Sequence, residues 1–184
     1  MNQNDNTIKN VCVFCSSRDS IAPVYGEAAV ELGEMLGQRG VRVINGAGST
    51  GLMRIIADAV MRTGGTACGV IPRFMVESGV CYDSMTECIE VETMHERKQL
   101  MSAMSDAVVA LPGGYGTLEE LLEIITWRQL ELYNKPVIVL NTNGFYDPLM
   151  AMFDRAVEQN FIRSDNRGLF IEARTPAEVL SVLF

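Results

Sequence analysis

The sequence predicts an α/β protein with a doubly wound parallel sheet, three layers deep (α/β/α), in a single domain over residues 1–184. Short apolar runs without alternation recur along the chain, as in strands that are buried on both faces. Segments of helical periodicity lie between these runs, and this alternation gives parallel βαβ units with right-handed crossovers. The length of 184 residues falls within the roughly 100 to 200 residues of one domain.

The expected elements follow one another from residue 11. In the first expected helix, one apolar face is followed by Gly40, which ends the pattern; the residues of this face are Ala29, Leu32, Met35 and Leu36. The segment ECIEVE at 87–92 fits either a further strand or an edge excursion, and residues 1–7 are expected to be flexible. The expected strands are residues 11–14, 41–44, 67–71, 106–111 and 136–140, and the expected helices are residues 22–39, 52–61, 94–104, 118–132 and 148–159.

Composition and charge exclude several classes of function. Hydrophobic residues make up 48% and charged residues 21% of the chain, which suits a buried core and argues against disorder. The 15 Lys and Arg face 23 Asp and Glu, and this charge of -8 indicates no nucleic-acid partner. The first ten residues lack a signal-peptide pattern, and no apolar run reaches the roughly 18 residues of a membrane helix. We therefore expect a cytoplasmic protein with no membrane partner.

Cysteine and histidine usage gives no indication of a metal site. Five cysteines are an odd number, which excludes a fully paired disulfide framework. Cys12 and Cys15 form a C-x-x-C, but residues three apart on a strand point to opposite faces, and no second pair accompanies them. His95 is the only histidine, which removes two-histidine metal sites. We expect neither a metal nor a cofactor.

Two glycine-rich loops follow predicted strands, at the sheet edge where ligands of such folds bind. NGAGSTG covers residues 45–51 and PGGYGT covers residues 112–117, and each enters a predicted helix. Glycine lets the backbone approach a ligand closely, and a helix start offers free N–H groups to an anion. Glycine can also occur at such turns only because it tolerates backbone φ angles that other residues avoid. Two such loops in one small domain favour a phosphate-bearing ligand.

The first loop does not fit the better-known nucleotide motifs. Gly46, Gly48 and Gly51 match the dinucleotide pattern G-x-G-x-x-G. However, the loop follows the second strand, and residues 66–69, about 20 positions further on, contain no acid to hold a ribose. Neither loop has the Lys-Ser or Lys-Thr of a P-loop. The sequence therefore favours a mononucleotide or a sugar phosphate.

Two polar clusters are candidates for chemistry. Glu120, three residues after Thr117, could be an acid at the ligand. However, T-x-x-E is also the pattern of a helix capping box, and the spacing alone leaves both interpretations open. Arg97 and Lys98 lie in the first turns of a predicted helix, where cations oppose the helix dipole. Such placement is tolerated more easily when an anion is nearby.

Four short motifs together resemble the LOG (LONELY GUY) family, long labelled "possible lysine decarboxylase". The resemblance extends from VFCSS in the first strand to about Phe161. It implies a Rossmann-like fold, a homodimer, and hydrolysis of the N-glycosidic bond of a nucleoside 5'-monophosphate, either AMP or a cytokinin riboside monophosphate. The motifs are MHERK (94–98), PGGYGTLEE (112–120), TWRQL (126–130) and NKP (134–136).

The same resemblance implies site residues. Arg97 and Glu120 match the catalytic pair of the family, and Arg97 also matches a substrate contact. The other implied substrate contacts are Ser17, Gly46, Gly48, Gly51, Lys98, Gly113, Gly114, Tyr115, Gly116, Thr117, Leu118, Glu119 and Thr126.

This sequence departs from the family pattern at several positions. The first glycine loop has Asn45, Ala47 and Arg54 at its leading, third and final motif positions. Glu77 is the nearest counterpart of a family glutamate but is displaced by two positions, and Gly79 stands at the aligned place.

The implied chemistry suits the residues. Breaking a ribosyl C–N bond develops positive charge at the anomeric carbon, which a carboxylate such as Glu120 can stabilise while it takes a proton from water. Arg97 would keep Glu120 ionised, since a nearby cation lowers a carboxyl pKa. Lysine decarboxylation would need pyridoxal phosphate on a lysine and a larger chain. The alternative is a non-catalytic carrier or sensor of a nucleotide or molybdopterin cofactor, which has no need of an acid-base pair.

Overall fold

The computed structural model describes residues 8–184, so the expectation for residues 1–7 lies outside the described residues. Its centre is one sheet of seven strands in the order β4-β3-β2-β1-β5-β6-β7, and every neighbouring pair is parallel. The strands are β1 (Asn10–Phe14), β2 (Arg42–Asn45), β3 (Thr66–Pro72), β4 (Glu87–Val91), β5 (Ala107–Ala110), β6 (Val137–Leu140) and β7 (Ile171–Ala173).

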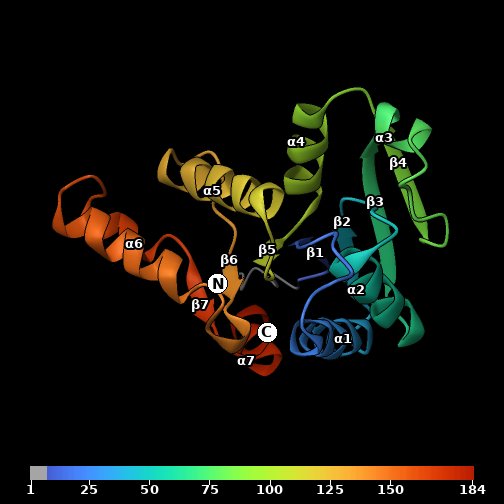
Figure 1. Cartoon of the computed structure of the whole chain (residues 1–184), viewed down its shortest axis with the longest axis horizontal. Helices are drawn as coiled ribbons and strands as arrows, with labels where there is room; N and C mark the ends of the chain where they lie inside the picture. The colour runs from blue at the N-terminus through green and yellow to red at the C-terminus, as the bar shows by residue number, and fades with distance from the viewer. Residues whose placement is uncertain (1–7) are drawn as a thin grey trace, which may run out of the picture.

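Helices cover both faces of the sheet and give the three expected layers (Figure 1). One face packs against α1, α2 and α7, and the other against α4, α5 and α6. The helices are α1 (Pro23–Gly37), α2 (Gly51–Arg62), α3 (Arg73–Glu77), α4 (Met94–Met104), α5 (Tyr115–Gln129), α6 (Asp147–Glu158) and α7 (Pro176–Leu183), with 3-10 turns η1 (Thr142–Gly144) and η2 (Ser164–Gly168).

Alternate residues of β1 contribute to two separate cores. Val11 and Val13 pack into the cluster under α1, α2 and α7, whereas Cys12 and Phe14 pack into the cluster under α4, α5 and α6. Burial on both faces explains why the strands are continuous apolar runs. Cys15 belongs to the first cluster, so Cys12 and Cys15 do point to opposite faces as predicted.

The strand order reverses between β1 and β5. The chain adds β2, β3 and β4 outward on one side of β1, then returns to the middle and adds β5, β6 and β7 on the other. Ligands of open α/β sheets bind at this reversal, outside the carboxyl ends of the strands. The backbone joins the loops there, since Ser16 N–H donates to Pro112 O (3.2 Å) and Leu52 N–H donates to Ser16 O (2.9 Å).

Most predicted elements are confirmed, with boundary shifts of a few residues. The segment at 87–92 is the edge strand β4, parallel to β3. β7, α3 and α7 were not predicted, because three to eight residues are too few for a clear period. Within residues 8–184, no helix combines the length and apolar character needed to cross a membrane.

Candidate active site

A cavity of about 500 Å³ lies outside the carboxyl ends of the central strands. Its polar lining comes from four segments: the loop after β1, the loop after β2, the start of α4 and the start of α5. It therefore lies at the strand reversal, where the sequence predicts a ligand. Ten of the implied site residues line it: Ser17, Gly46, Gly48, Arg97, Gly114, Tyr115, Gly116, Thr117, Glu119 and Glu120.

Arg97 and Glu120 face each other at the wall of this cavity. Arg97 lies in the first turn of α4 and Glu120 in the second turn of α5. The guanidinium Nη2 is 4.0 Å from the carboxylate Oε1, and the two side chains are 8% and 11% exposed. Two residues from different helices are thus brought together as the family resemblance implies. At 4.0 Å the groups attract electrostatically without a close hydrogen bond.

Local structure fixes the position of Arg97. A capping box formed by Thr93 and Glu96 starts α4, with Glu96 N–H donating to Thr93 Oγ1 at 3.1 Å. Gly46 leaves room for the guanidinium, since a Cβ at Gly46 would lie 1.6 Å from Arg97 Nη2. This glycine is therefore required for close approach and not for turn geometry.

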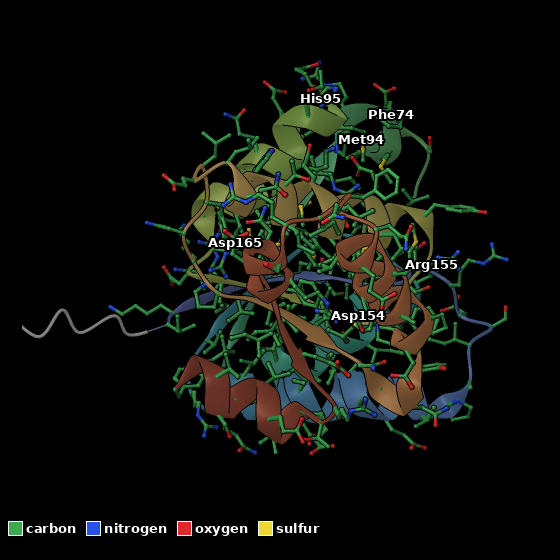
Figure 2. All side chains as sticks on the ribbon, turned by 90° about the vertical axis from the view of Figure 1, so that its left-hand side faces the viewer. Phe74, Met94, His95, Asp154, Arg155 and Asp165 are labelled. Carbon is green, nitrogen blue, oxygen red and sulfur yellow. The ribbon has the colours of Figure 1, made fainter. Side chains whose placement is uncertain are left out.

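The Arg97 guanidinium has few hydrogen-bond acceptors around it. Its Nη1 lies 3.7 Å from the thioether sulfurs of Met75 and Met94, which are weak acceptors. Its Nε is buried and has no hydrogen-bond partner within the described residues. Figure 2 shows Met94, one of these two methionines, near Phe74 of α3 at one end of the molecule. A buried, poorly partnered cation beside a cavity is suited to an oxygen-rich ligand.

The pKa of the Glu120 carboxyl is raised above its ordinary value. Burial raises its pKa, the nearby Arg97 lowers it, and Glu119 raises it again, with smaller opposed effects of Lys98 and Glu123, so that the pKa is about 7. Arg97 lowers this pKa in the expected direction, but the cost of burying the carboxylate is larger than the attraction to the guanidinium, so the net shift is upward. A carboxyl that titrates near neutrality can exchange protons during a reaction.

The capping-box reading of Thr117 and Glu120 is wrong. The N-cap of α5 is Gly114, and no side chain of residues 8–184 caps the helix. Thr117 is the third helical residue and is 4% exposed. Glu120 is consequently too far along the helix to reach its start. The acidic side chain is free for a role in the cavity.

The first backbone amides of α5 are unpaired. Within the described residues, the amide groups of Tyr115, Gly116 and Thr117 donate to no protein acceptor, and the first turn carries no acidic residue. Cβ atoms placed at Gly114 and Gly116 would meet nothing within 4 Å. Free N–H groups and the positive end of the helix dipole thus face the cavity with space around them.

The start of α2, after the first glycine loop, is already occupied. Gly51 N–H donates to Asp19 Oδ1 at 2.8 Å, and Leu52 N–H donates to Ser16 O at 2.9 Å. A Cβ on Gly51, which has a φ of +64°, would lie 2.5 Å from the backbone of Ser17. Gly51 is therefore needed for the close approach of the loop after β2 to the loop after β1. Of the two predicted anion loops, only the one at α5 keeps its helix start free.

The departures from the family pattern have local structural roles. Asn45 Oδ1 accepts a hydrogen bond from Ala47 N–H (2.9 Å), while Asn45 Nδ2 donates to Met53 O (3.0 Å). Ala47 adopts a φ of 57°, a left-handed conformation that favours glycine. Arg54 stacks on the ring of Tyr82 at 5.6 Å. Glu77 is exposed at the end of α3, outside the cavity lining.

Other implied contact residues also lie outside the cavity lining. The Lys98 ammonium pairs with Glu119 and Glu123 of α5, so it joins α4 to α5. Thr126 is exposed and its hydroxyl donates to Leu122 O at 2.7 Å. Their contact with a nucleotide remains a prediction, as it does for Gly51, Gly113 and Leu118, which also lie outside the lining.

Sequence reasoning missed the apolar part of the lining. The thioether side chains of four methionines, together with Val80, line the cavity beside the polar groups. The methionine content, 11 residues, was a weak signal, because core packing explains methionines equally well. The four are Met53, Met75, Met94 and Met101.

Comparisons with known proteins show the family of this chain. The family model described as "Possible lysine decarboxylase" matches residues 53–183. A protein of Oryza sativa subsp. japonica named "Probable cytokinin riboside 5'-monophosphate phosphoribohydrolase" is 46% identical over 92% of this chain and 76% of its own length. An Arabidopsis thaliana protein named cytokinin riboside 5'-monophosphate phosphoribohydrolase is 40% identical over 100% of this chain and 86% of its own.

A solved structure supports the fold. The molybdenum cofactor carrier protein of Chlamydomonas reinhardtii superposes with a TM-score of 0.72 at 21% identity, over 96% of each chain. At this identity the likeness shows the Rossmann-like fold alone.

Burial of Glu120 predicts a specific dependence of stability on pH. Its folded pKa of about 7 lies above the unfolded value of about 4.5, so the folded state binds more protons between these values. The stabilisation that comes from the protonated Glu120 carboxyl is present below pH 4.5 and is lost as the pH rises through 7. Glu120→Gln cannot ionise and does not lose it. Over this pH range, the free energy of unfolding of the variant should therefore increase relative to that of the wild type by up to about 3 kcal/mol.

Urea unfolding at several pH values measures this difference. Glu31→Gln, which removes an exposed carboxylate on α1, is the matched control and should show no such trend. A difference between Glu120→Gln and wild type that stays constant from pH 4.5 to 8 would contradict the pKa shift.

Proposed function

The chain belongs to the family described as "Possible lysine decarboxylase", and on this premise we propose that it is a nucleoside 5'-monophosphate phosphoribohydrolase. It hydrolyses the N-glycosidic bond of AMP or of a cytokinin riboside monophosphate and releases the free base and ribose 5-phosphate. The reaction uses water and the side chains of the chain, with no cofactor. The names of the curated relatives support this activity.

The observation that carries the proposal is the buried pair of Arg97 and Glu120 at the cavity wall. Burying a guanidinium and a carboxylate costs several kcal/mol per ion, and their attraction offsets this cost only in close, fully hydrogen-bonded geometry. Here the groups are 4.0 Å apart and Arg97 Nε has no partner within the described residues. Stability does not explain such a pair, whereas chemistry on a bound ligand does.

The start of α5 provides the phosphate site. The free amides of Tyr115, Gly116 and Thr117 would bind the 5'-phosphate, and no side chain competes for them. Glu120 lies on the same helix, so a phosphate bound at the helix start places the ribose next to the carboxylate. Such anchoring converts binding energy into orientation of the reacting carbon.

Glu120 and Arg97 then perform the chemical step. As the C–N bond breaks, the Glu120 carboxylate stabilises the positive charge at the anomeric carbon and accepts a proton from the attacking water, while the departing base takes up a proton from solvent at its glycosidic nitrogen. Arg97 orients Glu120 and can hydrogen-bond to ribose oxygens through the part of its guanidinium that lines the cavity. The leaving base is accommodated by the methionine-lined part of the cavity, which suits an apolar, planar group.

The carrier alternative is less well supported. The likeness to a molybdenum cofactor carrier is at 21% identity and concerns the fold. A carrier needs an anion site, which α5 supplies, but it has no use for a carboxyl with a pKa of about 7 beside the bound molecule. The Arg97–Glu120 pair therefore favours an enzyme.

We also propose that the protein is a homodimer. The family resemblance implies it, and α5 exposes a suitable stripe, since Leu122, Thr126 and Leu130 follow at helical spacing with Leu122 41% and Leu130 58% exposed. Of the methionines that could form such a surface, Met94 and Met152 are exposed, whereas Met101 and Met150 are buried in the core.

Glu120→Gln separates catalysis from folding. The variant keeps the side-chain shape but cannot accept a proton, so kcat for the monophosphate should fall by roughly 10² or more. The Kd for AMP should stay within a few fold, because the α5 amides are unchanged. In the wild type, kcat should rise with pH up to about 7 and then level off, since the carboxylate is the active form.

Glu96→Gln is the matched control for this variant. It neutralises a carboxylate next to Arg97, but a capping box accepts Gln as well as Glu, so its kcat should match the wild type. Wild-type turnover in Glu120→Gln would remove this residue from the mechanism and favour the carrier alternative.

Gly114→Asp tests the phosphate site. Asp is a favoured N-cap residue, and Gly114 is extended (φ -92°, ψ -151°) with free space around it, so the variant should be at least as stable as the wild type. Its carboxylate would occupy the helix start and repel phosphate, which should raise KM for AMP at least about tenfold. Steady-state kinetics measure this change.

Gly114→Asn is the neutral control, because it provides the same cap without charge and should perturb KM far less. Adenosine, which lacks the phosphate, should be a much poorer substrate than AMP for the wild type. Equal kcat/KM for AMP and adenosine, or an unchanged KM in Gly114→Asp, would contradict a phosphate site at α5.

Sedimentation equilibrium tests the dimer. We expect a mass twice the chain mass of 20.3 kDa at micromolar concentrations, and Leu130→Glu should shift the protein towards the monomer by placing a charge in the interface. A wild-type mass of one chain across this range would show that the protein is a monomer.

A further inference from the structure

Two cysteines outside the Arg97–Glu120 site lie in contact. The sulfur atoms of Cys81 and Cys88 are 3.4 Å apart, Cys88 being exposed and Cys81 partly so. The other three cysteines are buried. Only this pair therefore combines mutual contact with access for a small reagent. A disulfide bond, with its S–S length of about 2.05 Å, needs the two sulfurs to approach further from this contact.

Cys81 belongs to a segment that forms part of the cavity wall. It makes an antiparallel bridge with Gly48, which lies in the first glycine loop. On either side of this bridge, Ser49 N–H donates to Val80 O (3.0 Å) and Tyr82 N–H donates to Ala47 O (2.9 Å). Gly48, Ser49 and Val80 all line the cavity.

Cys88, by contrast, belongs to the sheet. It lies on β4, in register with Gly69 of β3. A covalent bond between the two cysteines would thus join the cavity-wall segment to the edge strand. We propose that Cys81 and Cys88 form a reversible disulfide that fixes residues 80–82, and with them the first glycine loop, against the sheet.

The sulfur chemistry gives the order of steps. Partial desolvation of its sulfur, together with the hydrogen bond to Cys81, raises the pKa of Cys88 to about 12, so Cys88 stays a thiol; either sulfur can donate the S–H···S contact. Cys81 therefore makes the first attack. With a small disulfide such as oxidised glutathione as oxidant, Cys81 displaces one glutathione thiolate and forms a mixed disulfide.

Cys88 completes the exchange. Its thiol loses a proton to solvent, attacks the Cys81 sulfur and displaces the second glutathione. Two protein thiols are oxidised and one glutathione disulfide is reduced to two thiols, so atoms and electrons balance. Protein disulfides of this exposed kind are typically transient and regulatory where glutathione is reducing.

Mass spectrometry of the intact protein tests the bond. After incubation of the reduced, native chain with oxidised glutathione, we expect a mass lower by two hydrogens and a linked Cys81–Cys88 peptide. Cys81→Ser and Cys88→Ser each retain one exposed thiol and should give a glutathione adduct instead. A wild type that accumulates adducts, or disulfide-linked dimers, without the internal bond would overturn the proposal.

Amide hydrogen exchange tests the link to the cavity wall and requires no enzymatic activity. Exchange at Ser49 and Tyr82 should slow at least about tenfold in the oxidised protein and recover on reduction. The amide of Val108 in β5, far along the sheet order from β4, is the internal control. Unchanged exchange at Ser49 and Tyr82 in fully oxidised protein would show that the bond does not restrain the glycine loop.

Discussion

The buried, incompletely partnered pair of Arg97 and Glu120 is the constraint on which the rest of the site depends. Two charged groups at 8% and 11% exposure are costly to bury, and most of that cost could be avoided by apolar side chains of similar volume. The surrounding structure instead maintains the pair. Gly46 gives Arg97 its space, the capping box at Thr93 starts its helix, and Lys98 holds α4 against α5.

The sheet topology brings these parts together. Arg97 and Glu120 lie on two consecutive helices on the same face of the sheet, and β5 between them lies beside β1 at the strand reversal. The two glycine loops meet at the same place, yet their helix starts differ. Asp19 and Ser16 O accept hydrogen bonds from the first two amides of α2, whereas the first amides of α5 have no protein acceptor within the described residues. One cavity therefore combines unpaired helix-start amides, a carboxyl with a pKa of about 7 and an apolar wall.

Much of this arrangement could be predicted from the sequence, because buried parallel strands and strand-end glycines are local patterns. The position of α4 at 94–104 was predicted as observed. What could not be predicted depends on contacts between distant residues. Asp19, which accepts the hydrogen bond from the first amide of α2, lies 32 residues before that amide in the sequence. The pKa of Glu120 depends on how deeply the folded chain buries its side chain. The spacing of Thr117 and Glu120 could not distinguish a cap from a catalyst, since this depends on Gly114 starting the helix.

Breakage of a glycosidic bond by the Arg97–Glu120 pair is tested most directly by incubating the purified protein with a panel of nucleoside 5'-monophosphates and quantifying free base and ribose 5-phosphate. We expect release of both products in equal amounts from at least one purine monophosphate. Tight binding of nucleotides with no ribose 5-phosphate across the whole panel would contradict it and would identify the protein as a carrier.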